Sequence, residues 1–378
     1  MVKTSQNEQS PASQHTEQTQ AEQFMSFATS VQPASSNTDL SQLDERRIRL
    51  DDPPPKPVSV YCLADHQICT AGNITGIVSQ AKMGKTAVLG AFLAAAASPC
   101  GRDVADIMGY DFLTITAAPH HGKAVVLFDT EQSRYDAWQL VKRAATRAGR
   151  GDLPPNFRAY STADLETAKR RAYLAAELQR ASAECGGIHS VFIDGISDLC
   201  EDPNDLVEAC GLIEELVQLA IKYDCPIIVV LHENPSGTGQ EYSKGRGHLG
   251  SQLERKAESN LRVVKDAKGI STIYSDRSRR ASIPKDMGPR FQWNSSAGMH
   301  VSVAGDIKSD KADEKRKDVQ LAVDAVFGGI VGTLPYGELT ERIMEVLHEK
   351  ARTAQRRIKE WANLGLIAST EKGIYYRK

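Results

Sequence analysis

The sequence predicts an α/β protein in which helices flank a mostly parallel sheet, followed by a small domain of helices and a hairpin. From Val58 to about residue 302, short and almost continuously apolar runs alternate with amphipathic stretches of helical length. Buried parallel strands joined by crossover helices produce this alternation. A glycine-containing loop also separates the first such run from a helical stretch, as in a strand–loop–helix unit. Beyond residue 318, short amphipathic helices indicate a second core.

The predicted strands cover residues 72–79, 124–128, 190–193, 226–231, 261–264 and 271–274. The predicted helices of the same domain cover residues 86–97, 133–148, 163–185 and 204–223. Ligands of open parallel sheets bind outside the carboxyl ends of the strands. The polar residues directly after each strand are therefore the candidates for a functional site.

Composition bounds the rest of the chain of 378 residues. Residues 1–50 are rich in Gln, Ser, Thr and Asn without a sustained apolar period, so we expect a disordered tail. A proline-rich stretch then opens a domain over residues 51–302, a charged linker follows over 303–318, and a terminal domain occupies 319–378.

The seven cysteines are odd in number and never spaced C-x-x-C, so free thiols in a reducing compartment are expected. The apolar runs are shorter than a membrane span, and the first residues lack the apolar core of a secretory signal. We therefore expect a cytoplasmic protein without membrane association. The net charge of -2 neither indicates nor excludes a polyanionic partner.

The loop after the first strand has the spacing of a P-loop. Its residues are Ser79, Gln80, Ala81, Lys82, Met83, Gly84, Lys85 and Thr86. In such loops backbone N–H groups surround nucleotide phosphates, the lysine reaches the β- and γ-phosphates, and the hydroxyl holds Mg²⁺. Ser79 departs from the usual pattern, in which glycine or alanine stands at the first position. A chance match in a surface loop is the alternative, but the flanking strand and helix favour a phosphate site.

Two carboxylates follow later strands. Glu131 comes after the strand 124–128, where it can deprotonate an attacking water. Alternatively, Asp129 or Ser133 merely caps the next helix. Both interpretations can hold, since a cap at Ser133 leaves Glu131 available. Asp194 ends the strand 190–193, where a buried strand places a carboxylate near Mg²⁺. An aspartate after a strand is common and is weak evidence by itself. The P-loop spacing upstream makes the assignment of Asp194 to a metal site more specific. Asp198 is predicted to be structural.

A histidine and two arginines complete the candidates. His232 follows the strand 226–231 and would face the γ-phosphate, although core packing is the alternative for a single histidine. Residues 236–250 are expected to form a mobile loop able to contact phosphates. Arg277 and Arg279 follow the strand 271–274; a solvated charge run is the alternative to an arginine finger reaching a neighbour's site in a ring.

Together these stretches resemble the RecA-fold ATPases, in particular the plasmid RepA hexameric helicases and related ATPases of phages and mobilizable elements. The matching stretches are SQAKMGKT, DTEQS, VFIDGISDL, IIVVLHEN, GRGHLGSQLERKAESNLRV and the R-x-R of Arg277 and Arg279. They span residue 72 to about residue 280 in the family's order.

The resemblance implies ATP and Mg²⁺ as cofactors and a homohexameric ring with single-stranded DNA passing through it. It implies that Glu131 is the general base, that Asp194 binds metal-associated water, and that His232 senses phosphate. Arg277 with Arg279 would act on a neighbouring subunit. Arg246 would lie in the family's DNA-facing or interface segment.

Helices over 319–327, 336–348 and 351–363, with a hairpin of 366–368 and 374–376, resemble a winged helix. Ala354, Ile358, Trp361 and Leu364 recur at helical spacing and predict a small core. From residue 350 onward eight Lys or Arg residues stand against two Glu. This charge favours duplex DNA as the partner over a protein-docking role. The predicted contact residues are Arg352, Gln355, Arg356 and Lys359.

The sequence therefore predicts an ATP-hydrolysing, DNA-binding motor of the replicative-helicase type, acting on plasmid, phage or mobile-element DNA. The alternative is an ATP-switched DNA-binding regulator that recruits partners in transposition, excision or replication without unwinding. A small-molecule kinase is less favoured, since no substrate lid is apparent and the tail is basic.

Overall fold

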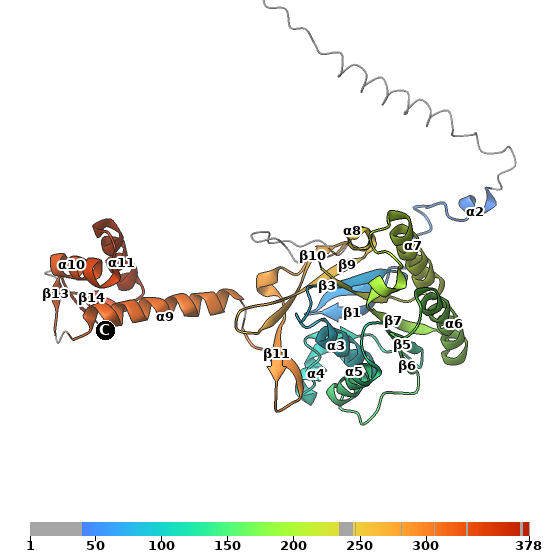
Figure 1. Ribbon diagram of the computed structural model, residues 1–378. Coiled ribbons are helices and arrows are strands. Elements are labelled where there is room, and N and C mark those ends of the chain that lie inside the picture. Colours follow the sequence, from blue (N-terminus) through green and yellow to red (C-terminus); the bar gives the residue numbers. More distant parts are fainter. Residues whose placement is uncertain are drawn as a thin grey trace, which may run out of the picture. The chain divides into compact units, whose positions relative to one another are not determined.

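The computed structural model describes residues 40–233, 245, 247–280, 282–305, 307–329, 332–370 and 373–377 (Figure 1). The chain divides into two units, residues 1–56 and 57–378. Within the first unit, the described residues contain one short helix, α2 (Ser41–Asp44). Most of the tail predicted to be disordered, and Arg246, lie outside the described residues.

Nine strands of the described chain form the central sheet, in the order β12-β11-β10-β9-β3-β8-β7-β5-β6. The parallel strands are β9 (Ser259–Lys265), β3 (Ile74–Ser79), β8 (Ile227–His232), β7 (Ile188–Asp194), β5 (Ala124–Asp129) and β6 (Phe157–Ser161). The antiparallel strands are β10 (Ser271–Ser278), β11 (Arg290–Asn294) and β12 (Met299–Val303). The predicted mostly parallel sheet is thus confirmed.

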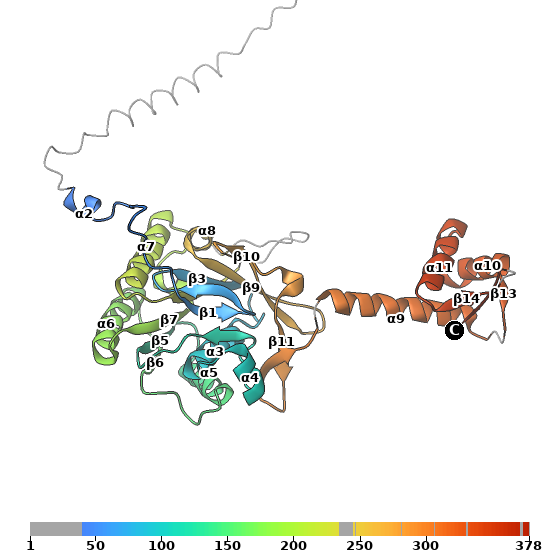
Figure 2. The same cartoon turned by 180° about the vertical axis from the view of Figure 1, so that it is seen from behind.

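Helices cover both faces of this sheet (Figures 1 and 2). On one face α3 (Lys85–Ala97) and α5 (Arg134–Arg147) share a core with Ile77 and Val125, and on the other α6 (Thr167–Cys185) and α7 (Leu206–Lys222) share a core with Val78 and Val126. Successive strand side chains point to opposite faces. Since both faces are covered, every position of β3, β5 and β7 is buried, which explains their continuous apolar runs.

All six predicted strands and all four predicted helices of this domain are present, with ends shifted by a few residues. The small antiparallel sheet of β1 (Ser59–Leu63), β2 (His66–Thr70) and β4 (Ile115–Ala117) was not predicted, nor were β6, β11, β12 and α4 (Arg102–Met108). These elements are short, and β6 is a partly exposed edge strand without an apolar run. Part of the predicted loop 236–250 is helical, because α8 spans Gly247–Lys256.

The last helices and strands have their own core, which contains Val323, Leu339, Ile343 and Trp361. It is formed by α9 (Ile307–Phe327), α10 (Tyr336–Leu347) and α11 (Ala351–Asn363), with a sheet of β13 (Leu334–Pro335), β15 (Ile374–Arg377) and β14 (Ile367–Ser369). The predicted helices and hairpin are therefore present.

Two details of this region differ from the prediction. The charged segment expected to be a linker is helical from Ile307 onward, because its alternating Asp, Glu, Lys and Arg residues are compatible with a helix even without an apolar stripe. Leu364 is 42% exposed and does not join the core, because α11 ends one residue before it. No helix within the described ranges is long and apolar enough to span a membrane.

Candidate functional site

The carboxyl ends of the parallel strands bring four of the six predicted catalytic residues together. Ser79 at the end of β3 pairs with His232 at the end of β8, and Asp129 at the end of β5 pairs with Asp194 at the end of β7. A cleft of about 260 Å³ opens at this edge. It is lined by Lys82, Gly84, Lys85, Thr86, Ala87, Glu131, Asp194, His232, Lys265 and His300. Lys85, Glu131, Asp194 and His232, which were chosen from the sequence alone, thus share one cleft.

The loop between β3 and α3 has the backbone that a phosphate site requires. Gly84 precedes the helix at a φ of 110°, and a Cβ there would lie 2.8 Å from the Phe291 ring, so glycine is needed on two counts. Gly84 supplies no capping side chain to the first N–H groups of α3, whose first residues Lys85, Thr86 and Ala87 line the cleft. The departure at Ser79 is accommodated, because its buried hydroxyl donates to the Gln80 carbonyl at 3.1 Å.

The Lys85 ammonium is the centre of the hydrogen bonding. Its Nζ donates to the carbonyls of Ser79 and Gln80 at 3.0 and 2.9 Å and contacts Nδ1 of His232 at 3.1 Å. Burial lowers the pKa of Lys85, against the opposing effect of Glu131 and Asp194. Since an ammonium only donates, Nδ1 of His232 must be the acceptor. Nε2 of His232 then carries the proton and donates to Glu131 Oε2 at 3.0 Å.

Two further carboxylates are held by a residue that the sequence analysis did not single out. Nε2 of Gln132 donates to Asp129 at 2.8 Å and to Asp194 at 2.9 Å. Asp129 also accepts the backbone N–H groups of Glu131 and Gln132, so it fixes the turn that carries Glu131. Burial and the nearby charges of Asp129 and Glu131 raise the pKa of Asp194 to about 7. The D-x-x-Q spacing after β5 was visible in the sequence, but only the fold brings Asp194 within reach of it.

The donors in the cleft suit Mg²⁺ bound together with a nucleotide. Thr86 and Asp194 line the same cleft and provide the hard oxygen atoms that this ion prefers. Among the described residues no group of three or more His, Cys, Asp or Glu could hold a metal alone.

The predicted arginine pair lies outside this cleft. β10 continues to Ser278, beyond its predicted end, so Arg277 is on the strand and its Nη1 contacts Glu254 at 2.7 Å. Nη2 of Arg279 donates to the carbonyl of Lys256 at 2.7 Å. Neither arginine lines the cleft that contains Lys85.

A buried ion-pair chain connects the neighbourhood of His232 with Arg277. Glu233, the residue after His232, contacts Arg262, and Nη2 of Arg262 contacts Glu254 at 2.8 Å. Glu254 in turn contacts Arg277. Side chains of Arg262 and Glu254 are only 5% and 6% exposed, so removing one partner would leave a buried charge unpaired. The sequence analysis missed this chain because its members come from the residue after β8 and from β9, α8 and β10.

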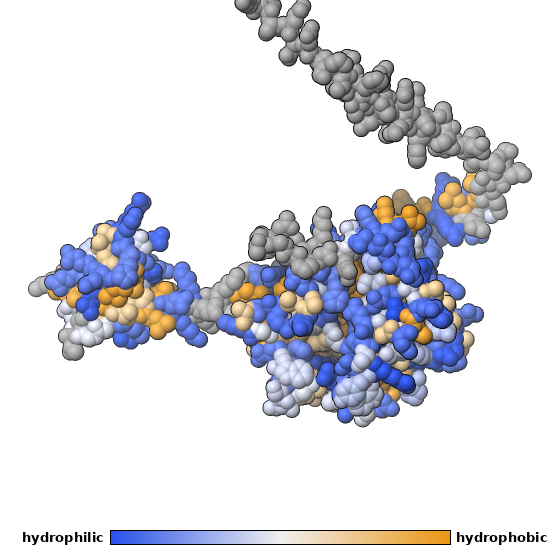
Figure 3. Space-filling model, viewed as in Figure 1, coloured by the Kyte–Doolittle hydropathy of each residue, from blue (hydrophilic) through white to orange (hydrophobic). Residues whose placement is uncertain are grey.

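The predicted DNA-contacting residues of α11 are all exposed: Arg352, Gln355, Arg356 and Lys359. Ala354, Ile358 and Trp361 on the other side are buried, as predicted. Arg357, on the same helix, is only partly exposed, and its Nη2 pairs with Glu349 at 2.6 Å. The visible surface of α11 is accordingly mostly hydrophilic in Figure 3.

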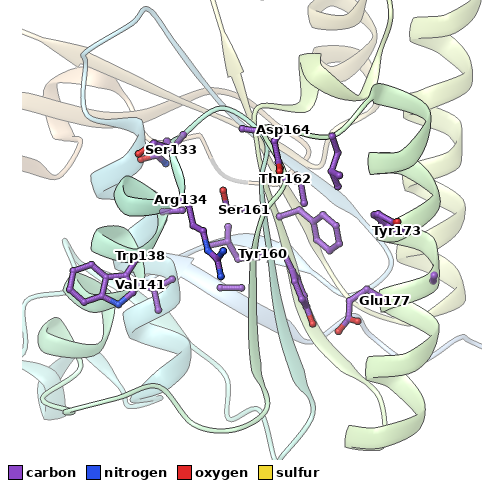
Figure 4. Close-up of a pocket in the computed structure, with 18 of the residues that line it drawn as sticks. Ser133, Arg134, Trp138, Val141, Tyr160, Ser161, Thr162, Asp164, Tyr173 and Glu177 are labelled. Atoms are coloured by element: carbon purple, nitrogen blue, oxygen red, sulfur yellow. The ribbon is translucent and has the colours of Figure 1, made fainter.

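A second, larger cavity of about 960 Å³ lies between α5 and α6 beside the edge strand β6. Figure 4 shows Arg134 and Tyr160 at this cavity, with Trp138 on α5 and Tyr173 on α6 at its sides. None of the phosphate-loop residues lines it. The smaller cleft is the candidate site because the loop, the strand ends and the ionisable groups converge there.

No protein-family model matches the sequence. No curated protein matches it either. Among solved structures, the crystal structure of the RadB recombinase is similar, with 18% sequence identity, coverage of 64% of this chain and 95% of that chain, and a TM-score of 0.40. The chain's own architecture is a mostly parallel sheet flanked by helices, with a loop of P-loop spacing between β3 and α3.

Proposed function

We propose that this chain is an ATP-hydrolysing, DNA-binding motor of the replicative-helicase type, acting on plasmid, phage or mobile-element DNA as a homohexameric ring. The observation that carries the ATPase part is the shared cleft of Lys85, Glu131, Asp194 and His232 at the carboxyl edge of the sheet. A RecA-like fold is the common setting for such a cleft, and the basic terminal helix supports a nucleic-acid partner.

Residues 79–86 would bind the ATP phosphates through their backbone N–H groups, and Thr86 with Asp194 would hold Mg²⁺. Magnesium, when bound, neutralises charge that develops on the phosphate oxygens. Lys85 would exchange the carbonyls of Ser79 and Gln80 for β- and γ-phosphate oxygens. This exchange also withdraws the hydrogen bond that Lys85 makes to His232, so His232 responds to whether the site is filled.

Glu131 would accept a proton from the attacking water. At the same time the water oxygen bonds to the γ-phosphorus, and the bond between this phosphorus and the ADP oxygen breaks. Its hydrogen bond from His232 links the base to the residue that Lys85 releases. His232 therefore joins phosphate sensing to the position of the base. Gln132 and Asp129 keep the turn in place during this step.

The DNA contacts are proposed in two places. Single-stranded DNA would pass through the ring near the segment containing Arg246, and the terminal domain, a winged helix in this proposal, would bind duplex DNA through α11. The DNA contacts therefore differ between the two domains.

Three measurements distinguish the motor from a regulator without unwinding activity. A motor shows ATP turnover stimulated by single-stranded DNA, displacement of a paired strand and the mass of a ring. Slow turnover, tight duplex binding and no displacement would instead indicate the regulator.

The ring predicts an active site shared between subunits. Arg279→Ala should lower ATP turnover, and mixing it with Lys85→Ala should restore activity, because the second variant supplies the arginine to an intact phosphate loop of the first. In an equal mixture that assembles at random, roughly a quarter of the interfaces are complete. Turnover of each variant alone is the control, and no recovery at any mixing ratio would count against a shared site.

The terminal helix predicts a salt-dependent duplex contact. Replacing Arg352 and Arg356 together with Ala should weaken duplex binding and reduce the slope of log affinity against log salt by about two, since two phosphate contacts are lost. Lys317→Ala, an exposed lysine on α9, is the matched control and should change neither strongly. Fluorescence anisotropy over a salt series measures both quantities. Unchanged binding by the double variant would favour the protein-docking alternative.

A further inference from the structure

The described cleft has an end that the proposed chemistry does not use. Glu131 follows β5, and Asp194 and His232 end β7 and β8, whereas Lys265 and His300 come from β9 and β12. In the sheet, β8 and β9 lie on opposite sides of β3, the strand that leads into the phosphate loop. Residues of β9 and β12 therefore line the cleft on the side of the loop opposite to the catalytic carboxylates.

We propose that the His300 ring contacts the nucleoside of the bound nucleotide at this end of the cleft. This inference rests on the proposed function, in which the cleft binds ATP. A triphosphate held by residues 79–86 with its γ-phosphate near Glu131 and His232 extends its α-phosphate and nucleoside away from them. His300 is the aromatic side chain that lines the opposite end.

His300 is held rigidly by its neighbours. Its ring lies edge-on to Phe291, at 5.5 Å between centroids, and to Trp293, at 5.4 Å. Phe291 is fully buried and packs against Gly84, so this aromatic group is continuous with the phosphate loop. The buried Arg147 donates to the His300 carbonyl. A ring fixed in this way can contact a ligand with little loss of conformational entropy.

The chemistry of the two ends of the cleft also differs. In the loop Lys82 and Lys85 supply positive charge for phosphates, whereas beside His300 the Nζ of Lys265 donates to the Lys82 carbonyl at 2.8 Å. Burial, together with the charges of Lys265, Arg147 and Arg143, lowers the pKa of His300 to about 4. The ring is therefore uncharged at neutral pH and is suited to a base or ribose rather than to a phosphate.

The test compares ligands with and without a nucleoside. Equilibrium binding of ATP, ADP and inorganic tripolyphosphate is measured with Mg²⁺ on the full chain and on His300→Leu, which keeps volume but removes the ring, and His300→Phe, which keeps an aromatic ring. We expect His300→Leu to weaken ATP and ADP binding about tenfold and to leave tripolyphosphate binding unchanged. His300→Phe should retain most of the nucleotide affinity.

The outcomes separate this inference from the function on which it rests. ATP binding by the wild-type chain that His300→Leu does not weaken would overturn the inference alone, as would equal losses for ATP and tripolyphosphate. A wild-type chain that binds none of the three ligands would overturn the proposed function as well. Thermal unfolding of each variant shows whether it is folded. If His300→Leu does not fold, the test uses His300→Phe, and equal losses of affinity for tripolyphosphate and ATP in that variant would overturn the inference.

Discussion

Lys85→Ala is expected to abolish ATP turnover, lowering the rate by at least about 100-fold. The Lys85 ammonium is buried, whereas Lys82 and Lys265, the other lysines that line the cleft, are exposed. The same substitution removes the donor to Nδ1 of His232, so the link between the loop and Glu131 is lost as well. Phosphate release measured on purified protein with Mg²⁺ and saturating ATP gives the rate.

The matched control for this prediction is Lys169→Ala. Lys169 is an exposed lysine on α6 that pairs with Glu166 at 3.2 Å and lies outside the cleft, so turnover should stay close to the wild-type rate. Thermal unfolding of both variants establishes that they are folded. A wild-type rate in Lys85→Ala would remove the phosphate-site interpretation.

Glu131→Gln is expected to lower turnover by about 10² to 10⁴ while ATP affinity changes little. Glutamine keeps the size and the acceptor for Nε2 of His232 but cannot take a proton from water. Single-turnover hydrolysis and equilibrium nucleotide binding measure the two quantities separately. The combination of lost turnover and retained binding is what distinguishes a base from a binding residue.

The control for Glu131→Gln is Glu166→Gln, an exposed glutamate at the start of α6 that lies outside the cleft. It should leave both quantities unchanged. Full turnover in Glu131→Gln would exclude Glu131 as the base. Loss of ATP binding together with turnover would instead assign it a structural role in the cleft.

Much of the fold was predictable because its cause is local in sequence. Strands buried on both faces must be apolar throughout, so β3, β5, β7 and β8 were visible as continuous runs. The rule that ligands bind at the carboxyl ends of parallel strands then selected Glu131, Asp194 and His232 without any contact information. The loop between β3 and α3 was visible because its glycine, lysine and threonine spacing is itself local.

Other features could not be predicted because they depend on side chains from distant strands. The role of Gln132 as a donor to two carboxylates exists only because β5 and β7 are neighbours in register. Likewise, Glu254 on α8 pairs with Arg277 on β10. This ion pair joins the arginine to a helix of its own subunit. The short strands of the β1-β2-β4 sheet carry too few residues for a distinct pattern.

By itself, the amino-acid sequence determined the long buried strands and the helices between them, the loop with P-loop spacing and the polar residues that follow each buried strand, since hydrophobic periodicity and turn chemistry act over a few neighbouring residues. Only the tertiary structure decided which of those polar groups meet, and it added Lys265 from β9 and His300 from β12. The physical reason is that hydrogen bonds and charge pairs depend on distances of a few ångströms, and strand order sets those distances for residues far apart in the chain.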